Sequence, residues 1–202
     1  MSSDLSATSR RVPQQERAAR RVDELLEAAG AVIAERGFEA ATMTEIAERA
    51  GASIGSVYQY FPNKDALVHA LRTRYGNEMD ARWSALSAAS EGLAVPALVD
   101  RLFSLMVELM AKRPAYIPLL SVSLNFRRDE ASRNRLRERF SELFRRYNPD
   151  LSGEEAYRIA EVTLQVVKSL NALYAAAKPK ERKLLVAEYK TVVSSYLLAR
   201  LG

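Results

Sequence analysis

The fold of this chain is decided by residues 42–67, which read TMTEIAERAGASIGSVYQYFPNKDAL. The segment opens with a capping box, because the hydroxyl of Thr42 can accept a hydrogen bond from the amide of Glu45 while the carboxylate of Glu45 reaches back to the amide of Thr42. A short helix is predicted from this point. It stops at Gly51, since glycine readily takes the left-handed backbone conformation that ends many helices.

A second short helix is predicted directly after this glycine. Ser53 is a good N-cap, and Pro62 prevents the helix from continuing beyond about Tyr60. Asn63 then caps a longer helix. Two short helices joined by a tight turn and braced by a longer preceding helix form a helix-turn-helix, whose second helix is the one suited to a DNA major groove.

Helical periodicity continues on both sides of this segment. A first helix is predicted over residues 16–36, where Leu25, Ala29 and Val32 repeat at spacings of three and four residues. Beyond Ser90 the pattern predicts further helices over residues 95–112, 115–123, 130–147, 153–177 and 180–201. No stretch alternates apolar and polar residues as a strand does, so we expect an all-α protein.

Composition narrows the class of protein. The chain has 202 residues, 48% of them hydrophobic, and no cysteine, which excludes a disulfide scaffold and cysteine-based zinc sites. No window is long and apolar enough to span a membrane or to act as a signal peptide, so we expect a soluble cytoplasmic protein with no membrane partner. The net charge of +5 does not mark a DNA-binding head, because residues 1–66 hold eight basic and ten acidic residues.

Residues 1–20 are predicted to be a basic, partly disordered arm. From Arg10 to Arg21 the chain carries five arginines, and Glu16 is the only acidic residue among them. Such a run is usually a solvated tail. It can instead follow a DNA backbone or minor groove when the adjacent fold binds DNA, so both interpretations stay open.

The second short helix has a face suited to a DNA groove. A helix that reads base edges needs small or polar residues on its leading face, which here are Ser53, Gly55, Ser56, Gln59 and Tyr60. Candidate phosphate contacts are three kinds of group near the helix starts: the hydroxyls of Thr42, Thr44 and Ser53, the phenol of Tyr58, and Lys64. Two packed helices with a purely structural role, in which Tyr58, Tyr60 and Phe61 are core aromatics, have the same spacing. A structural role is therefore the alternative to DNA binding.

Residues 21–67 carry a resemblance to a known family. The matching positions are residues 25–29, 37–38, 41–43, 46–47, 50–53, 57–58 and 60–67. With these residues the segment resembles the DNA-binding head of TetR-type transcriptional regulators. Ile33 departs from the family, which more often has Phe there; this is a volume change in a core position.

The resemblance implies an all-helical homodimer, with a helix-turn-helix head over residues 21–66 and a ligand-sensing and dimerisation domain over residues 67–202. It implies a regulator, more often a repressor, that a small-molecule ligand releases from a near-palindromic operator. Matched position by position, contacts to phosphates or the groove fall on Thr42, Thr44, Ser53, Ser56, Tyr58, Tyr60 and Lys64. The sequence-reading positions match Gly55 and Gln59.

The middle of the chain is rich in large apolar side chains. In the resembled family this region encloses a small-molecule pocket, and such pockets are mostly apolar with a few polar groups. The candidate ligand-binding residues are Trp83, Phe103, Met106, Met110, Tyr116, Phe126, Gln165 and Asn171. Ordinary core packing is the alternative for each of them. The expected ligand is small and apolar or amphipathic.

The last two predicted helices favour a dimer. The helix over residues 153–177 is apolar around most of its circumference, so it must be buried on more than one side. The helix over residues 180–201 adds a further apolar face. We therefore expect these two helices to pair with those of a second copy, the alternative being a monomer core that absorbs both faces.

Enzymatic chemistry has little support in the sequence. His69 is the only histidine, and it falls inside a predicted helix next to no serine nucleophile motif. No phosphate-binding loop, dinucleotide motif or metal-spaced set of carboxylates is present, so no enzyme, cofactor or metal site is expected. A dimeric helical interaction module that does not read DNA is the remaining alternative.

Overall fold

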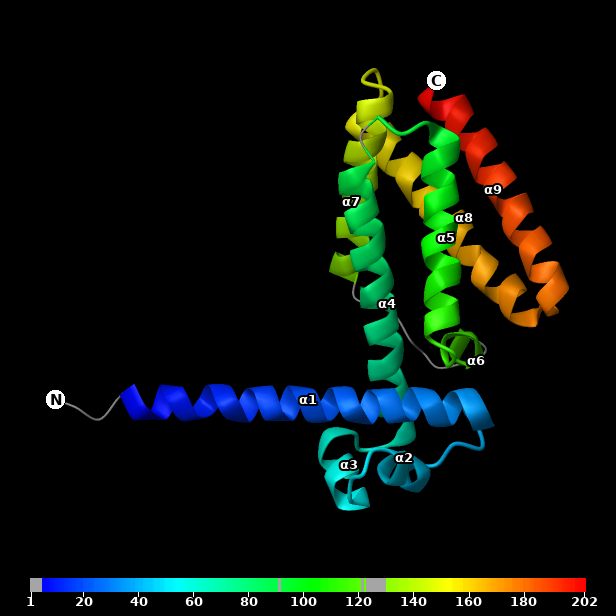
Figure 1. Ribbon diagram of the computed structural model, residues 1–202. Coiled ribbons are helices and arrows are strands. Elements are labelled where there is room, and N and C mark those ends of the chain that lie inside the picture. The colour runs from blue at the N-terminus through cyan, green and yellow to red at the C-terminus, as the bar shows by residue number, and fades with distance from the viewer. Residues whose placement is uncertain (1–4, 91, 121, 123–129) are drawn as a thin grey trace. The chain divides into compact units, whose positions relative to one another are not determined.

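The computed structural model describes residues 5–90, 92–120, 122 and 130–202. Regular secondary structure in these residues is entirely helical, which confirms the all-α prediction. The helices are α1 (Leu5–Arg36), α2 (Met43–Arg49), α3 (Ile54–Tyr60), α4 (Lys64–Ala89), α5 (Val95–Lys112), α6 (Tyr116–Leu120), α7 (Glu130–Tyr147), α8 (Gly153–Ala176) and α9 (Pro179–Leu201) (Figure 1). Phe126, one of the candidate ligand-binding residues, lies outside the described residues.

The first helix is longer than predicted. α1 begins at Leu5 rather than near Glu16, so residues 5–20 of the predicted arm continue the helix. Glutamine, arginine, alanine and glutamate, which favour helices, fill residues 14–20 and extend it in this direction. Pro13 has no amide hydrogen, so it removes one main-chain hydrogen bond from this part of α1.

The chain divides into two compact units, residues 1–72 and 73–202. The first unit, called the head below, contains α1, α2, α3 and the start of α4. The second unit contains the rest of α4 and all later helices. α4 runs without a break from Lys64 to Ala89, and the boundary between the two units falls inside it. This boundary lies a few residues after the one predicted at residue 66.

The head has its own small core. α1 contributes Leu25, Ala29 and Ile33, each fully buried, and α2 and α3 contribute Ile46 and Val57. The apolar face predicted for the first helix is therefore confirmed, including the buried position of Ile33. In Figure 1, α2 and α3 are the two short helices that follow α1 in the head.

The second unit has a larger, aromatic core. Trp83 of α4, Phe103 of α5, and Phe140 and Phe144 of α7 are its largest fully buried side chains, and α8 and α9 complete it with apolar residues. The indole nitrogen of Trp83 donates a hydrogen bond to the carbonyl oxygen of Leu102 (3.3 Å). In Figure 1, α8 crosses this unit diagonally past α5, and α9 returns in the opposite direction along one side. Among the described residues, no helix is both long and apolar enough to cross a membrane.

Candidate nucleic-acid interface

The start of α2 is fixed by the predicted capping box. The Glu45 amide donates to the Thr42 hydroxyl (3.2 Å), and the Thr42 amide donates to the Glu45 carboxylate (3.0 Å). Hydrogen bonds from the Thr42 side chain and then from its main chain lower the pKa of Glu45. The pair holds the first turn of α2, and it leaves the side chains of Thr42 and Thr44 on the exposed surface of the head.

The turn between α2 and α3 is held by main-chain hydrogen bonds. Gly51 has a φ of 58°, and its amide donates to the carbonyl of Glu48 (3.1 Å), while the amide of Ala52 donates to the carbonyl of Ala47 (2.9 Å). These two bonds form a Schellman motif, for which glycine is the favoured residue. The hydroxyl of Ser53 then accepts from the amide of Ser56 (3.2 Å) and starts α3. The predicted helix-turn-helix is confirmed.

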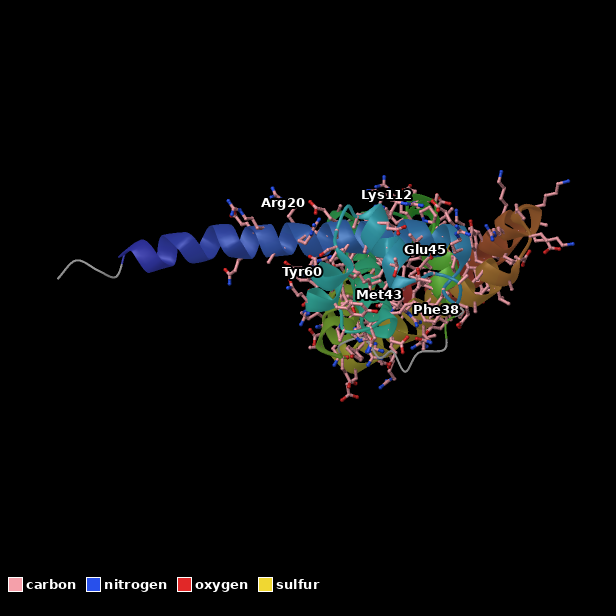
Figure 2. The ribbon with its side chains drawn as sticks, turned by 90° about the horizontal axis from the view of Figure 1, so that it is seen from below. Arg20, Phe38, Met43, Glu45, Tyr60 and Lys112 are labelled. Carbon is pink, nitrogen blue, oxygen red and sulfur yellow. The ribbon has the colours of Figure 1, made fainter. Side chains whose placement is uncertain are left out.

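α3 buries little of its own surface. Val57 is its one fully buried residue, while Gly55, Gln59 and, at its N-cap, Ser53 are exposed, and Tyr58 and Ile54 are 51% and 39% exposed. Ser56 and Tyr60 are half-buried. Figure 2 views the head from below, with Met43 and Tyr60 marking α2 and α3. The residues predicted for the leading face of this helix thus lie at the surface of the head, three of them exposed and two half-buried.

Gly55 is not required by the backbone of the head. Its φ lies outside the left-handed region, and a β-carbon added there would meet no other atom within 4 Å. Glycine is among the poorest helix formers, and Ala in its place would favour the helix by up to about 1 kcal/mol. The small size of Gly55 therefore suits a surface that another molecule approaches closely.

Lys64 has a role that the sequence interpretation did not anticipate. Its ammonium group donates to the carbonyl oxygens of Phe38 (2.8 Å), Glu39 (3.0 Å) and Ala41 (3.1 Å), and it lies 4.5 Å from the centre of the Phe38 ring. An ammonium group has three donors, and all three are engaged. Lys64 thus braces the loop between α1 and α2, which no spacing rule predicts, and its phosphate contact stays a prediction.

The other cations of the head divide into paired and unpaired groups. Arg49 forms a two-point ion pair with Glu35 of α1 (2.7 and 2.8 Å), and Arg21 pairs with Glu24 (2.9 Å). Arg17 and Arg20 are exposed and make no ion pair within the described residues. These two arginines keep their charge available to an anion, whereas Arg49 serves to join α1 and α2.

The candidate ligand-binding residues differ in how far they are buried. Trp83, Phe103, Met106 and Met110 are core residues of the second unit, each at most 4% exposed, whereas Gln165 is exposed. The structure brings Tyr116 and Asn171 together: the Asn171 amide nitrogen donates to the Tyr116 hydroxyl at 3.4 Å. The Asn171 carbonyl oxygen is buried and, among the described residues, has no hydrogen-bond partner. Nor do the described residues contain a group of three or more His, Asp or Glu that could hold a metal.

Exposed large hydrophobic side chains gather in two places. Ile54 and Tyr58 lie on α3, and the others among the described residues lie on α8 and α9: Val162, Leu173, Leu184, Val192 and Leu198, between 44% and 68% exposed. The opposite side of α8 is buried inside the protomer, with Ile159, Val167 and Leu170 almost fully enclosed. The apolar circumference predicted for this helix is therefore only partly covered within one chain.

Both units of the chain match known protein families. Residues 25–71 match the description "Bacterial regulatory proteins, tetR family", and residues 95–197, about half of the chain, match "Tetracyclin repressor-like, C-terminal domain". The HTH-type transcriptional repressor KstR2 of Mycobacterium tuberculosis is 42% identical over 60 residues, a match that covers only 30% of each protein. A similar solved structure is a putative TetR-family regulator from Mesorhizobium loti (17% identity, TM-score 0.68, 91% of this chain and 98% of that one).

A TetR-family regulator from Streptomyces coelicolor is also similar, with 22% identity and a TM-score of 0.64 over 90% of this chain and 99% of that one. At these identities the two structures support the fold alone. The two family matches cover the helix-turn-helix and most of the second unit. The chain therefore belongs to the tetR family of bacterial regulatory proteins.

Proposed function

We propose that this regulator is a DNA-binding transcriptional repressor that binds a near-palindromic operator as a homodimer and is released by a small apolar or amphipathic ligand. The observation that carries the proposal is α3, a helix whose two ends are fixed and whose polar face is exposed. A rigid helix with a free face can enter a major groove without rearrangement of the head.

Within this proposal the residues of the head divide into readers and anchors. Gly55 and Gln59 are exposed on α3 and read bases, Gln59 through an amide that suits adenine. The hydroxyls of Thr42, Thr44, Ser53, Ser56, Tyr58 and Tyr60 bind phosphates or line the groove, and they set the register of the head on the duplex. Arg17 and Arg20 strengthen binding to any duplex because they face no acidic partner in the described chain.

The dimer is proposed to form through α8 and α9. Five large hydrophobic side chains are exposed on these two helices, and full burial of a Val or Leu side chain is worth about 1.5–3 kcal/mol. A two-fold dimer places two heads on half-sites about 34–36 Å apart, or a multiple of that. The two-fold symmetry makes the operator a near-palindrome.

The ligand is proposed to enter the second unit beside Tyr116 and Asn171. The buried carbonyl oxygen of Asn171 lacks a partner in the described residues, and an unpaired buried acceptor costs about 1–3 kcal/mol. A ligand that donates a hydrogen bond to this oxygen recovers part of that cost. Tyr116 packs against a core that includes Trp83, Phe103 and Met106, and such a core suits an apolar body.

The experiment that tests the proposal is selection of random duplex DNA on the purified full-length protein, followed by a salt titration of the selected duplex. We expect a palindrome and a steep fall in affinity with salt, because phosphate contacts release counterions. The control is Ala88→Ser, at an exposed alanine near the end of α4, which should select the same sequence. No enriched sequence, or affinity that is independent of salt, would contradict DNA reading and favour a helical interaction module.

A further inference from the structure

A chain of side-chain contacts connects α8 with α4 through the corner between α5 and α6. At one end, Asn171 of α8 binds the hydroxyl of Tyr116, the first residue of α6. The Tyr116 ring lies 6.0 Å from the ring of Tyr75 on α4. At the other end, Arg113 lies over the Tyr75 ring (5.7 Å) and its Nε donates to the carboxylate of Glu78 (3.0 Å).

Glu78 is held at both of its oxygens. Arg113 binds one, and Arg82, one turn further along α4, binds the other at 3.0 Å. The side chains of Glu78 and Arg113 are only 21% and 16% exposed. Burial raises the pKa of Glu78, but the hydrogen bonds and charges of Arg113 and Arg82 lower it by more, so the carboxyl ends below its ordinary pKa and carries its charge at neutral pH.

The corner that carries Arg113 is itself fixed. The Arg113 amide donates to the carbonyl of Leu109 at the end of α5, and its own carbonyl accepts from the amide of Tyr116, each at 2.8 Å. Arg113 therefore has little freedom to follow α4 if that helix moves. In Figure 1 the corner is the junction at the lower end of α5, where α6 begins.

The ion pair between Glu78 and Arg113 lies only a short distance along α4 from the head. Tyr75 and Glu78 lie three and six residues after Arg72, the last residue of the head, on a helix that is continuous from Lys64. A helix transmits a tilt or a shift along its length because its own hydrogen bonds keep it straight. A contact that fixes α4 at Glu78 therefore also limits how its first turns move.

We propose that Arg113 and Glu78 are positioning residues for operator binding, and that Tyr116 and Asn171 connect this ion pair to α8. This inference rests on the proposed function. Without the ion pair, α4 samples more orientations in the second unit, and binding of both heads to one operator must first select among them. A ligand that donates a hydrogen bond to the Asn171 carbonyl oxygen, and so turns this side chain away from Tyr116, acts on the same contacts from the other end.

The matched control is a second ion pair of the same unit that does not involve α4. Arg137 of α7 and Glu161 of α8 lie 3.3 Å apart, with side chains 18% and 50% exposed. Glu161→Gln removes one charge from a partly buried arginine, as Glu78→Gln does. A merely structural role predicts that both substitutions lower the melting temperature and that neither changes operator affinity well below it.

The test measures operator Kd at one salt concentration, well below the lowest melting temperature, for the wild type, Glu78→Gln, Arg113→Gln, their double variant and Glu161→Gln. We expect each single variant on the α4 ion pair to bind about tenfold more weakly. The double variant should bind no more weakly than Glu78→Gln alone, since that change already breaks the contact between Glu78 and Arg113. Tyr116→Phe, which keeps the ring and removes the hydroxyl, should weaken binding by a smaller factor.

Glu161→Gln should bind within twofold of the wild type. An unchanged or tighter Kd for Glu78→Gln, or a double variant whose losses add, would overturn the inference. Hydrogen exchange of the free protein gives an independent readout: amides of residues 73–82 should exchange faster in Glu78→Gln than in Glu161→Gln. If the wild type selects no operator, the proposed function fails, and equal exchange in the two variants would separately refute the positioning role.

Discussion

In the head the candidate DNA-binding side chains are mostly exposed, and hydrogen bonds between residues three positions apart, Thr42 with Glu45 and Ser53 with Ser56, fix the main chain beneath them. In the second unit most of the candidate ligand-binding side chains are buried. The polar contacts around them join distant positions, such as Trp83 with Leu102 and Tyr116 with Asn171. The head can therefore change its surface chemistry at small cost to its fold, whereas the second unit cannot.

The largest expected effect separates the two regions by stability. Trp83→Ala should lower the free energy of unfolding by about 3–5 kcal/mol, because it leaves a cavity in a packed core. Tyr58→Ala, which removes a half-exposed aromatic ring from α3, should change it by less than about 0.5 kcal/mol. Urea denaturation measures the free energy of unfolding of both variants. Similar losses of stability would show that the Tyr58 side chain is packed in the fold and not exposed for binding.

The next effect tests Lys64, whose side chain binds carbonyl oxygens far away in the sequence of the head. Lys64→Met should lower the stability of the head by about 2 kcal/mol, because three carbonyl oxygens lose a charged donor. The salt dependence of DNA binding should stay unchanged, since the engaged ammonium group adds no counterion release. Lys112→Met, at an exposed lysine of α5, is the control. A salt slope that falls by about one for Lys64→Met would instead support the phosphate contact predicted from the sequence.

A smaller effect concerns the recognition of DNA bases by Gln59. Gln59→Ala should change the preferred base at one position of each half-site, with a loss of discrimination of about 1–3 kcal/mol and little change in stability. Selection of duplexes on the variant, next to the wild type, measures this directly. A uniform loss of affinity for all sequences would make Gln59 an anchor and not a reader.

Local signals explain how much of the head could be predicted. The capping box at Thr42 and the left-handed Gly51 are both predicted from residues within a few positions of each other, and each is present. Such motifs depend on neighbouring main-chain groups, so the sequence alone contains them. The free face of α3 followed from the same reasoning.

Contacts between distant positions explain what was missed. Lys64 binds carbonyl oxygens 23 to 26 residues away, and Arg113 reaches Glu78 across 35 positions. No periodicity in the sequence states which residues meet in this way, because packing of whole helices decides it. The exposed position of Gln165 has the same origin: the sequence placed it on α8, but only packing decides which side of α8 faces solvent.

The most direct test of the central claim, that the surface of α3 is reserved for DNA and not for the fold, is to measure stability and operator Kd on one preparation of Gly55→Ala. A β-carbon at this position meets open space in the free head, so the free energy of unfolding should rise by up to about 1 kcal/mol. Operator binding should weaken at the same time, because the added methyl group lies where DNA approaches. A variant that is more stable and binds the operator as tightly as the wild type would contradict the account.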